Sequence, residues 1–243
     1  MRRALAAALA CATAVAGCGG EGEPKRAAGP EPTATATVAP APPPARAVSF
    51  PASDGKRVTG EYTAVGRRAP AVVLLHEIRG GPDQWEDLVP DLHEAGFATL
   101  AYRSRPSIIE RERVPDLFGA VRWLRRRPDV DPRRIGLVGA SIGASTAVYA
   151  MATGARRTAA GAVALSPPDS ADIWDLQGGD RYRPHDLLLV SDDRESSSVE
   201  GMLDGAVRSK ALRSQRAGHG VALLAEPGVR GALLDWLRER LAG

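Results

Sequence analysis

A serine enclosed by small residues constrains the fold of this chain more strongly than any other feature. The segment 139–143 reads Gly-Ala-Ser-Ile-Gly, directly after the apolar run 135–138 and before a segment of helical character at 144–151. A strand, a tight turn and a helix must therefore follow one another within a few residues. Small residues are needed there because the helix passes close to the strand. The pattern predicts a turn that raises the Ser141 hydroxyl above a strand end; an ordinary glycine-rich turn is the alternative.

Strand-like and helix-like segments alternate along the chain from about residue 46. Apolar and β-branched runs predict strands at 48–50, 58–63, 71–75, 97–101, 135–138, 162–165, 186–190 and 211–214. The spacing of apolar residues predicts helices at 82–95, 114–126, 141 onward, 199–207 and 229–241. Parallel strands joined by helices need right-handed crossovers. We therefore predict an α/β fold, with a doubly wound, mostly parallel sheet and helices on both faces.

Two later loops carry the acid and the histidine that an activated serine needs. The apolar run 187–190 ends in Asp192 and Asp193, and a carboxylate just beyond a strand can reach the Nδ1 atom of a histidine on the same sheet edge. Asp193 is the first choice and Asp192 the second; a solvated acidic loop is the alternative. His219 lies between two glycines before the last helix, and its imidazole can accept the Ser141 proton near neutral pH. A structural histidine is the alternative there.

The first residues have the features of a targeting segment. Two arginines precede an apolar stretch at 4–16 that is too short to span a bilayer. The following Val-Ala-Gly-Cys, which ends at Cys18, resembles the lipobox of bacterial lipoproteins. We therefore expect a signal peptide at 1–17, lipid on Cys18, and a protein held outside the cytoplasm at the cell membrane. A plain secretory signal is the alternative. Cleavage before Cys18 leaves one cysteine, and so no intramolecular disulfide.

The segment 18–45 is composed mainly of Gly, Glu, Pro, Ala and Thr and has almost no large apolar side chains. Such a composition cannot bury a core, and its prolines favour an extended tether of about 3 Å per residue. With 243 residues and 44% hydrophobic side chains, the chain can still form one full-sized domain. We place this domain at 46–243.

Composition argues against several other classes of protein. The net charge of +3 is small, and the arginines at 125–127 and 133–134 lack interleaved aromatic residues, so we interpret them as a solvated face and not as a nucleic-acid site. Contact with an anionic membrane surface is the alternative. His76, His93 and His185 do not have metal-ligand spacing, and no phosphate-binding loop is present. We expect no metal, no cofactor and a monomer.

From about residue 47 onward the chain resembles a small α/β-hydrolase, nearest to the dienelactone-hydrolase-like branch. The resemblance rests on the G-x-S-x-G segment, on the order Ser141, Asp193, His219, and on the loop His-Glu-Ile-Arg-Gly that begins at His76. It implies an oxyanion hole formed by the backbone N–H groups of Ile142 and Glu77. It also implies that the Glu77 carboxylate contacts the nucleophile, whereas a solvent-facing glutamate is the alternative.

The chain departs from the dienelactone hydrolases in two ways. Those enzymes use cysteine where this chain has Ser141, and their substrate-binding arginine has no clean match. Arg103 and Arg105 lie near its position and could bind an anionic substrate, or could form surface salt bridges. His76 could contact substrate or be packed in its loop. Only 166–184 separates two predicted strands where this fold often inserts a lid, so we expect no lid domain and an open, shallow site.

These features together predict a serine hydrolase of the carboxylesterase type. Ser141 would attack a small-molecule ester, His219 would act as base and then acid, and Asp193 would orient the imidazole. An acyltransferase acting on a sugar or lipid of the cell envelope is one alternative. The other is a surface-tethered binding protein that keeps the hydrolase fold without activity.

Overall fold

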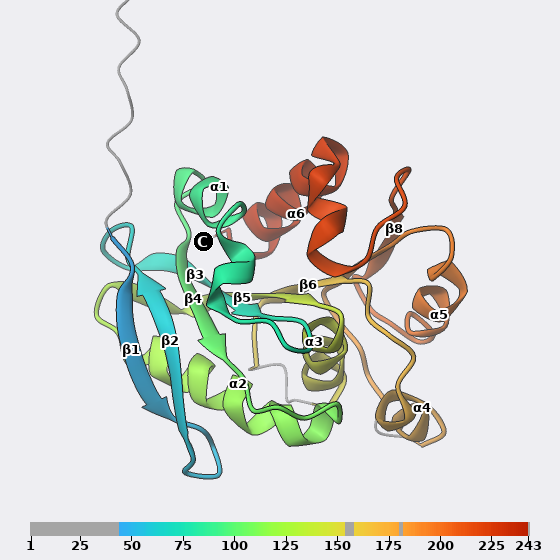
Figure 1. Ribbon diagram of the computed structural model, residues 1–243, viewed down its shortest axis with the longest axis horizontal. Helices are drawn as coiled ribbons and strands as arrows, with labels where there is room; N and C mark the ends of the chain where they lie inside the picture. The colour runs from blue at the N-terminus through green and yellow to red at the C-terminus, as the bar shows by residue number, and fades with distance from the viewer. Residues whose placement is uncertain (1–43, 154–157, 180–181, 243) are drawn as a thin grey trace, which may run out of the picture. The chain divides into compact units, whose positions relative to one another are not determined.

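The computed structural model describes residues 44–153, 158–179 and 182–242, all within the unit Ala41–Gly243. Its centre is an eight-stranded sheet of order β1-β2-β4-β3-β5-β6-β7-β8 (Figure 1). The β1–β2 and β2–β4 pairs are antiparallel, and all other pairs are parallel. The strands are β1 Arg46–Pro51, β2 Arg57–Thr63, β3 Ala69–Leu75, β4 Ala98–Arg103, β5 Val130–Ala140, β6 Gly161–Leu165, β7 Leu187–Ser191 and β8 Lys210–Arg213.

Helices cover both faces of this sheet. They are η1 Pro82–Trp85, α1 Val89–Glu94, α2 Glu110–Arg125, α3 Ile142–Thr153, α4 Ala171–Gln177, α5 Ser196–Gly201, η2 Gly220–Ala225 and α6 Pro227–Arg240. Side chains of a strand alternate between the faces. Val73 thus packs in one core cluster with α2 and α3, while Val72 packs in another with α1 and α6. Figure 1 shows these two helix pairs on opposite sides of the sheet. The predicted doubly wound, mostly parallel sheet is confirmed.

The single helix expected at 82–95 is wrong. Residues Pro82–Trp85 form a 3₁₀ turn, and a separate helix, α1, begins at Val89. Pro90 has no N–H group, and its ring would collide with the carbonyl four residues earlier, so a helix from Pro82 cannot continue through it. Proline is accepted in the first turn of a new helix, where Pro90 lies.

Two other helices differ clearly in extent from the expected ones, and a third element was not expected. The helix expected at 114–126 already begins at Glu110, and the one expected at 199–207 ends at Gly201. The 3₁₀ helix η2, directly after His219, was not predicted at all. Between β6 and β7 the described residues form only the short helix α4, so no lid domain is inserted there.

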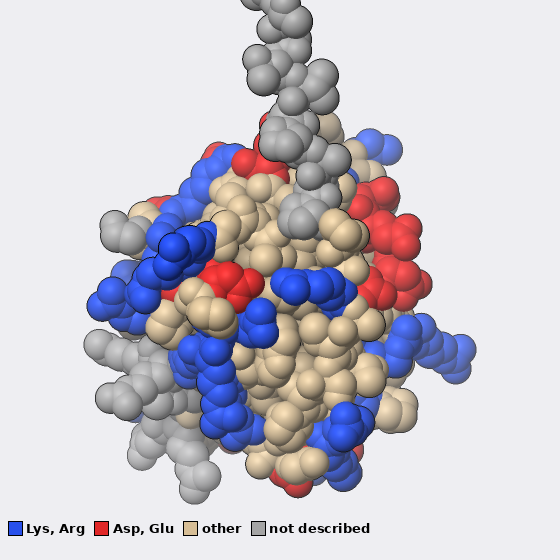
Figure 2. Space-filling model, turned by 90° about the vertical axis from the view of Figure 1, so that its left-hand side faces the viewer, with Lys and Arg blue, Asp and Glu red and all other residues tan. Residues whose placement is uncertain are grey.

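The expected signal peptide, the Cys18 lipidation site and nearly all of the tether lie outside the described residues, so they stay predictions. Among the residues that the structure describes, no helix has the length and apolar character that crossing a membrane requires. Figure 2 views the side that carries β1 and β2, where basic side chains are interspersed with acidic and uncharged ones. Local ion pairs neutralise some of the arginines interpreted as a solvated face, since Arg127 lies 3.2 Å from Asp129.

The contact between α2 and the end of β1 leaves no space for a side chain at Gly119. A Cβ there would lie 2.6 Å from the Pro51 carbonyl oxygen and 2.7 Å from the Ala52 Cα. We therefore expect Gly119→Ala to lower the free energy of unfolding by about 1–3 kcal/mol. Urea denaturation followed by circular dichroism measures this change.

Gly231→Ala is the matched control in α6, where a Cβ would meet no atom within 4 Å. The same substitution should there raise the free energy of unfolding by about 0.5–1 kcal/mol, because alanine loses less backbone entropy than glycine in a helix. Equal effects at the two positions would contradict this account of the α2 contact.

Candidate active site

Ser141 lies at the tight turn between β5 and α3 in a backbone conformation that is unfavourable for residues other than glycine. Its φ angle is 51°. Its N–H group donates to the Leu165 carbonyl oxygen at 2.9 Å, and its own carbonyl oxygen accepts from the N–H groups of Ala144 and Ser145. These bonds tie the turn to β6 on one side and to α3 on the other. They hold Ser141 at the carboxyl end of the parallel strands.

The two glycines of the segment are required by close packing. A Cβ on Gly139 would overlap the backbone of Gly143, and a Cβ on Gly143 would overlap the carbonyl of Leu75. α3 therefore starts directly against the end of β3. The sequence interpretation that small residues admit a close helix describes this geometry.

A cavity of about 440 Å³ lies beside Ser141. Four isoleucines contribute apolar wall, and two of these, Ile78 and Ile108, are 43% and 76% exposed at its rim. Its polar wall includes the carboxylates of Glu110, Asp169 and Asp172, and Asp172 pairs with Arg111. Among the described residues that line it, none is a lysine or arginine. The cavity is therefore partly apolar, and no described basic side chain lines it.

His219 is held by a carboxylate that the sequence analysis did not select. Its Nδ1 atom lies 2.6 Å from Oε1 of Glu195, the residue directly before α5. The second oxygen, Oε2, is buried and has no hydrogen-bond partner among the described side chains. Glu195 lies four residues beyond the end of β7, in a polar stretch where nothing in the sequence distinguishes it from its neighbours.

The two aspartates favoured by the sequence are placed elsewhere. Asp193 is 80% exposed and faces Arg213, with 3.4 Å between Nε and Oδ1. Asp192 is buried, but it accepts from Arg194 at 2.5 Å and from the Gly218 N–H at 3.2 Å. Hydrogen bonds from Arg194 lower the pKa of Asp192 to about 2. Within the described part of the chain, neither aspartate is hydrogen-bonded or ion-paired to His219; Asp193 is directed outward by the turn after β7.

The backbone N–H and the carboxylate of Glu77 bind to different parts of the structure. Its N–H group, one of the two expected oxyanion donors, already donates to Oε1 of Gln84 at 2.9 Å. Its carboxylate accepts the Val221 N–H at 2.9 Å, in the segment that follows His219. The next residue, Ile78, lines the cavity together with Ser141 and Ile142. The carboxylate thus faces the histidine loop, and neither interpretation drawn from the sequence describes that position.

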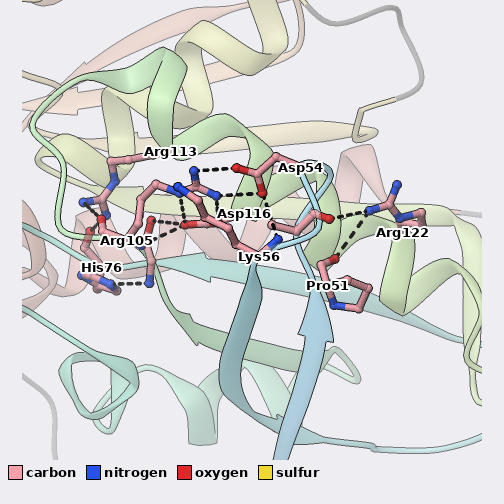
Figure 3. A network of polar contacts seen from close by, with 10 residues as sticks. Pro51, Asp54, Lys56, His76, Arg105, Arg113, Asp116 and Arg122 are labelled. Atoms are coloured by element: carbon pink, nitrogen blue, oxygen red, sulfur yellow. Dashed lines mark hydrogen bonds and ion pairs between the residues drawn. The ribbon is translucent and has the colours of Figure 1, made fainter.

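His76 is buried, and both of its ring nitrogens are engaged. The Ser104 N–H donates to Nε2 at 2.9 Å, so the proton is on Nδ1, which lies 2.5 Å from the Glu77 carbonyl oxygen. The buried Arg113 guanidinium donates to the His76 carbonyl oxygen at 3.2 Å (Figure 3). The packed-histidine interpretation describes this geometry, which leaves His76 no nitrogen for a substrate.

Arg103 and Arg105 are both directed to protein groups. Arg103 donates to the Gly80 carbonyl oxygen at 3.2 Å. Arg105 lies between Asp116 and Asp54, at 2.6 and 2.8 Å, as Figure 3 shows. Neither arginine lines the cavity beside Ser141. The salt-bridge alternative describes Arg105, and the substrate role of Arg103 stays a prediction.

Three segments that are distant in sequence meet at this edge of the sheet. Gly143 packs on the carbonyl groups of Leu75 and His76, and the adjacent Glu77 bonds to Val221 in η2. η2 also packs against β5 and β6. The serine turn, the loop after β3 and the histidine loop are therefore contiguous. No cluster of three metal-ligating side chains occurs among the described residues.

Comparison with solved structures identifies the architecture. The chain superimposes on an esterase of Pyrococcus furiosus with a TM-score of 0.66 and 16% identity, covering 82% of this chain and 94% of that one. A dienelactone hydrolase of Anabaena variabilis gives a TM-score of 0.65 and 20% identity, over 81% and 96% of the two chains. The chain has the α/β-hydrolase fold. A thermostable carboxylesterase from a metagenomic library has a similar TM-score of 0.65, with 17% identity over 85% of this chain and 92% of its own.

Sequence comparison matches a smaller part of this chain than structural comparison does. No family model matches the chain. Uncharacterized proteins from two strains of Mycobacterium tuberculosis share 34% identity with it over 113 residues, which is 42% of this chain and 40% of theirs. The chain thus matches less than half the length of these relatives.

A buried histidine, His76, and a partly buried one, His93, predict how the stability of this domain depends on pH. Burial lowers the pKa of His76 and of His93 below 6.5, so below that value the unfolded chain binds more protons than the folded chain. The free energy of unfolding should therefore fall as pH decreases from 7.5 to 5.5. Asp54 and Asp192, with pKa values of about 2, stay charged in this range.

Urea unfolding of the wild type and of His93→Gln at the two pH values measures this effect. The variant should lose part of the pH dependence, because one of the two shifted groups is gone. Stability that rises on acidification, or an unchanged slope in the variant, would contradict the assignment.

Proposed function

We propose that this α/β-hydrolase cleaves small carboxylic esters with Ser141 as nucleophile, His219 as base and Glu195 as the acid that orients the imidazole. The observation that carries the proposal is the 2.6 Å contact between Nδ1 of His219 and Glu195, in a loop that adjoins the serine turn. The esterases and the dienelactone hydrolase of the same fold support it. Glu195 takes the role that the sequence suggested for Asp193.

The protonation states of this arrangement suit acyl transfer. An ionised carboxylate can only accept hydrogen bonds, so Nδ1 of His219 carries the proton and Nε2 is free. Nε2 takes the Ser141 proton while Oγ forms a bond to the ester carbonyl carbon. The protonated imidazole then returns that proton to the leaving alkoxide as the ester C–O bond breaks. Water repeats the sequence on the acyl-enzyme and releases the acid.

Two backbone N–H groups can stabilise the oxyanion. Ile142 is the first residue of α3, where an N–H group has no intrahelical acceptor. Because the Glu77 N–H already donates to Gln84, we propose the N–H of Ile78 as the second donor. Each such donor typically lowers the barrier by about 3 kcal/mol.

The cavity beside Ser141 indicates the kind of acyl group. Its isoleucines provide apolar contact, and none of the described residues that line it is a lysine or arginine that could bind a second carboxylate. The proposed substrate is therefore an ester with a small acyl group that carries no negative charge. p-Nitrophenyl butyrate has these properties and serves as the probe.

Ser141→Ala should remove hydrolysis of p-nitrophenyl butyrate, because the variant lacks the hydroxyl that forms the acyl-enzyme. Loss of a triad serine costs up to about 10⁶-fold in kcat. The far-ultraviolet circular dichroism should be unchanged. A fluorophosphonate probe should label the wild type alone, since it reacts only with an activated serine.

Turnover of p-nitrophenyl butyrate that persists in Ser141→Ala would refute the proposal. A wild type that neither reacts with the fluorophosphonate nor hydrolyses the ester would favour the alternative of an inactive binding protein. Product analysis with an added alcohol distinguishes hydrolysis from acyl transfer, because an acyltransferase would form the new ester.

Glu195→Gln should lower kcat by about 10³–10⁴-fold, since the neutral amide neither fixes the tautomer nor stabilises the imidazolium. Asp193→Asn is the matched control: it removes a charge two residues away that faces Arg213. Its kcat should stay within a few fold of the wild type. Steady-state kinetics compare the two, and the opposite result would assign the acid to Asp193.

A further inference from the structure

The loop that carries His219 is bound to protein groups on both sides of the histidine. Before it, the Gly218 N–H donates to Oδ2 of Asp192 at 3.2 Å. After it, the Val221 N–H donates to Oε1 of Glu77 at 2.9 Å. Among the described residues, the imidazole is bound by Glu195 and not by either of these carboxylates. Two acids thus bind the backbone and a third binds the ring.

Glu77 and the histidine loop fit together closely. Gly220 has a φ angle of 57°, in the left-handed region that glycine adopts without strain. A Cβ at this position would overlap Oε1 of Glu77 and lie 2.8 Å from its Cδ. The carboxylate therefore packs against the backbone directly beyond His219. A side chain at residue 220 would have to displace it.

The backbone of Glu77 is itself held in place. Its N–H donates to Gln84, and its carbonyl oxygen accepts from the Gly80 N–H at 3.2 Å and from Nδ1 of His76 at 2.5 Å. His76 is in turn bound by the Ser104 N–H at the end of β4. Hydrogen bonds thus connect the Glu77 backbone to η1, through Gln84, and to the end of β4, through His76. They fix the position of the backbone from which the carboxylate extends.

We propose that Glu77 is a positioning residue, whose carboxylate fixes the segment after His219 and so directs Nε2 toward Ser141. The inference rests on the proposed esterase function and extends it to a residue that does not touch the reacting atoms. It assigns to Glu77 a role in the histidine loop, in contrast to the contact with the nucleophile that the family resemblance implies. The histidine loop is then held by the loop after β3, whose Leu75 and His76 carbonyl groups pack against Gly143.

Glu77→Ala should lower kcat for p-nitrophenyl butyrate by about 10–100-fold, because a displacement of about 1 Å in a catalytic group costs that much. The KM should change less than about two-fold, since the cavity beside Ser141 is not lined by Glu77. Glu77→Gln should keep most of the activity, because its amide oxygen can still accept the Val221 N–H. Glu86→Ala, an exposed glutamate on the same loop, is the matched control and should match the wild type.

Gly220→Ala tests the same contact from the opposite side. It should lower kcat in the wild-type background, where the new Cβ overlaps Glu77. Adding it to Glu77→Ala should cost less, because the overlapping carboxylate is gone and only the backbone strain at residue 220 remains. This double-mutant cycle gives a coupling that a general loss of stability does not produce. Thermal unfolding checks that each variant is folded.

The outcomes separate the positioning role from the proposed function. If the wild type is labelled by the fluorophosphonate and is active, and Glu77→Ala has the same kcat as the wild type, the positioning role is overturned and the proposed function stands. Equal losses in Glu77→Gln and Glu77→Ala, or additive losses in the cycle, would also overturn it. A wild type that is neither labelled nor hydrolytic would overturn the proposed function, and with it any catalytic effect of Glu77. If Glu77→Ala does not fold, the other two single variants test the positioning role. It predicts a kcat close to that of the wild type for Glu77→Gln and a lowered kcat for Gly220→Ala, and the opposite pattern overturns it.

Discussion

The close approach of α3 to the ends of β3 and β5 is the constraint on which the rest of this structure depends. No side chain fits at Gly139 or Gly143, and the chain must turn so sharply that Ser141 adopts a positive φ angle. Strain of this kind, of about 1–3 kcal/mol, persists only where surrounding contacts enforce it. Here the bonds to β6 and the first turn of α3 do so. The same approach brings the loop after β3 against the serine turn.

Carboxylates organise the other half of the candidate site. Asp192, Glu195 and Glu77 come from two separate regions of the chain, yet all three bind within the four residues 218–221. Each has a different partner: a backbone N–H before His219, the imidazole itself, and a backbone N–H after it. Asp192 is compensated by Arg194, so its burial does not leave an unpaired charge. This division of roles explains why a residue other than the first acid after β7 reaches the imidazole.

Elements were easier to predict than the side-chain partners. Each expected strand is present within a few residues, because buried parallel strands appear as continuous apolar runs such as 71–75 and 187–190. The single helix predicted at 82–95 is wrong because the apolar spacing on which it rests runs across Pro90, which a helix accepts only in its first turn. The contact between Glu195 and His219 was not predicted, because it joins residues that are 24 positions apart in the chain. The hydrogen bond from the Glu77 N–H to the Gln84 side chain was likewise not predicted, because it depends on the folded conformation of the loop between these residues.

The amino-acid sequence by itself determined the α/β class, the mostly parallel sheet, and the position of Ser141 at a strand end followed by a helix. These follow from short-range requirements: apolar runs that must be buried, prolines and glycines that end elements, and small residues where backbones meet. Only the tertiary structure decided which carboxylate pairs with His219, which backbone N–H groups stay free, and where Glu77 points. Those choices depend on angles at which loops from different strands leave one sheet edge, and local sequence does not encode such angles residue by residue.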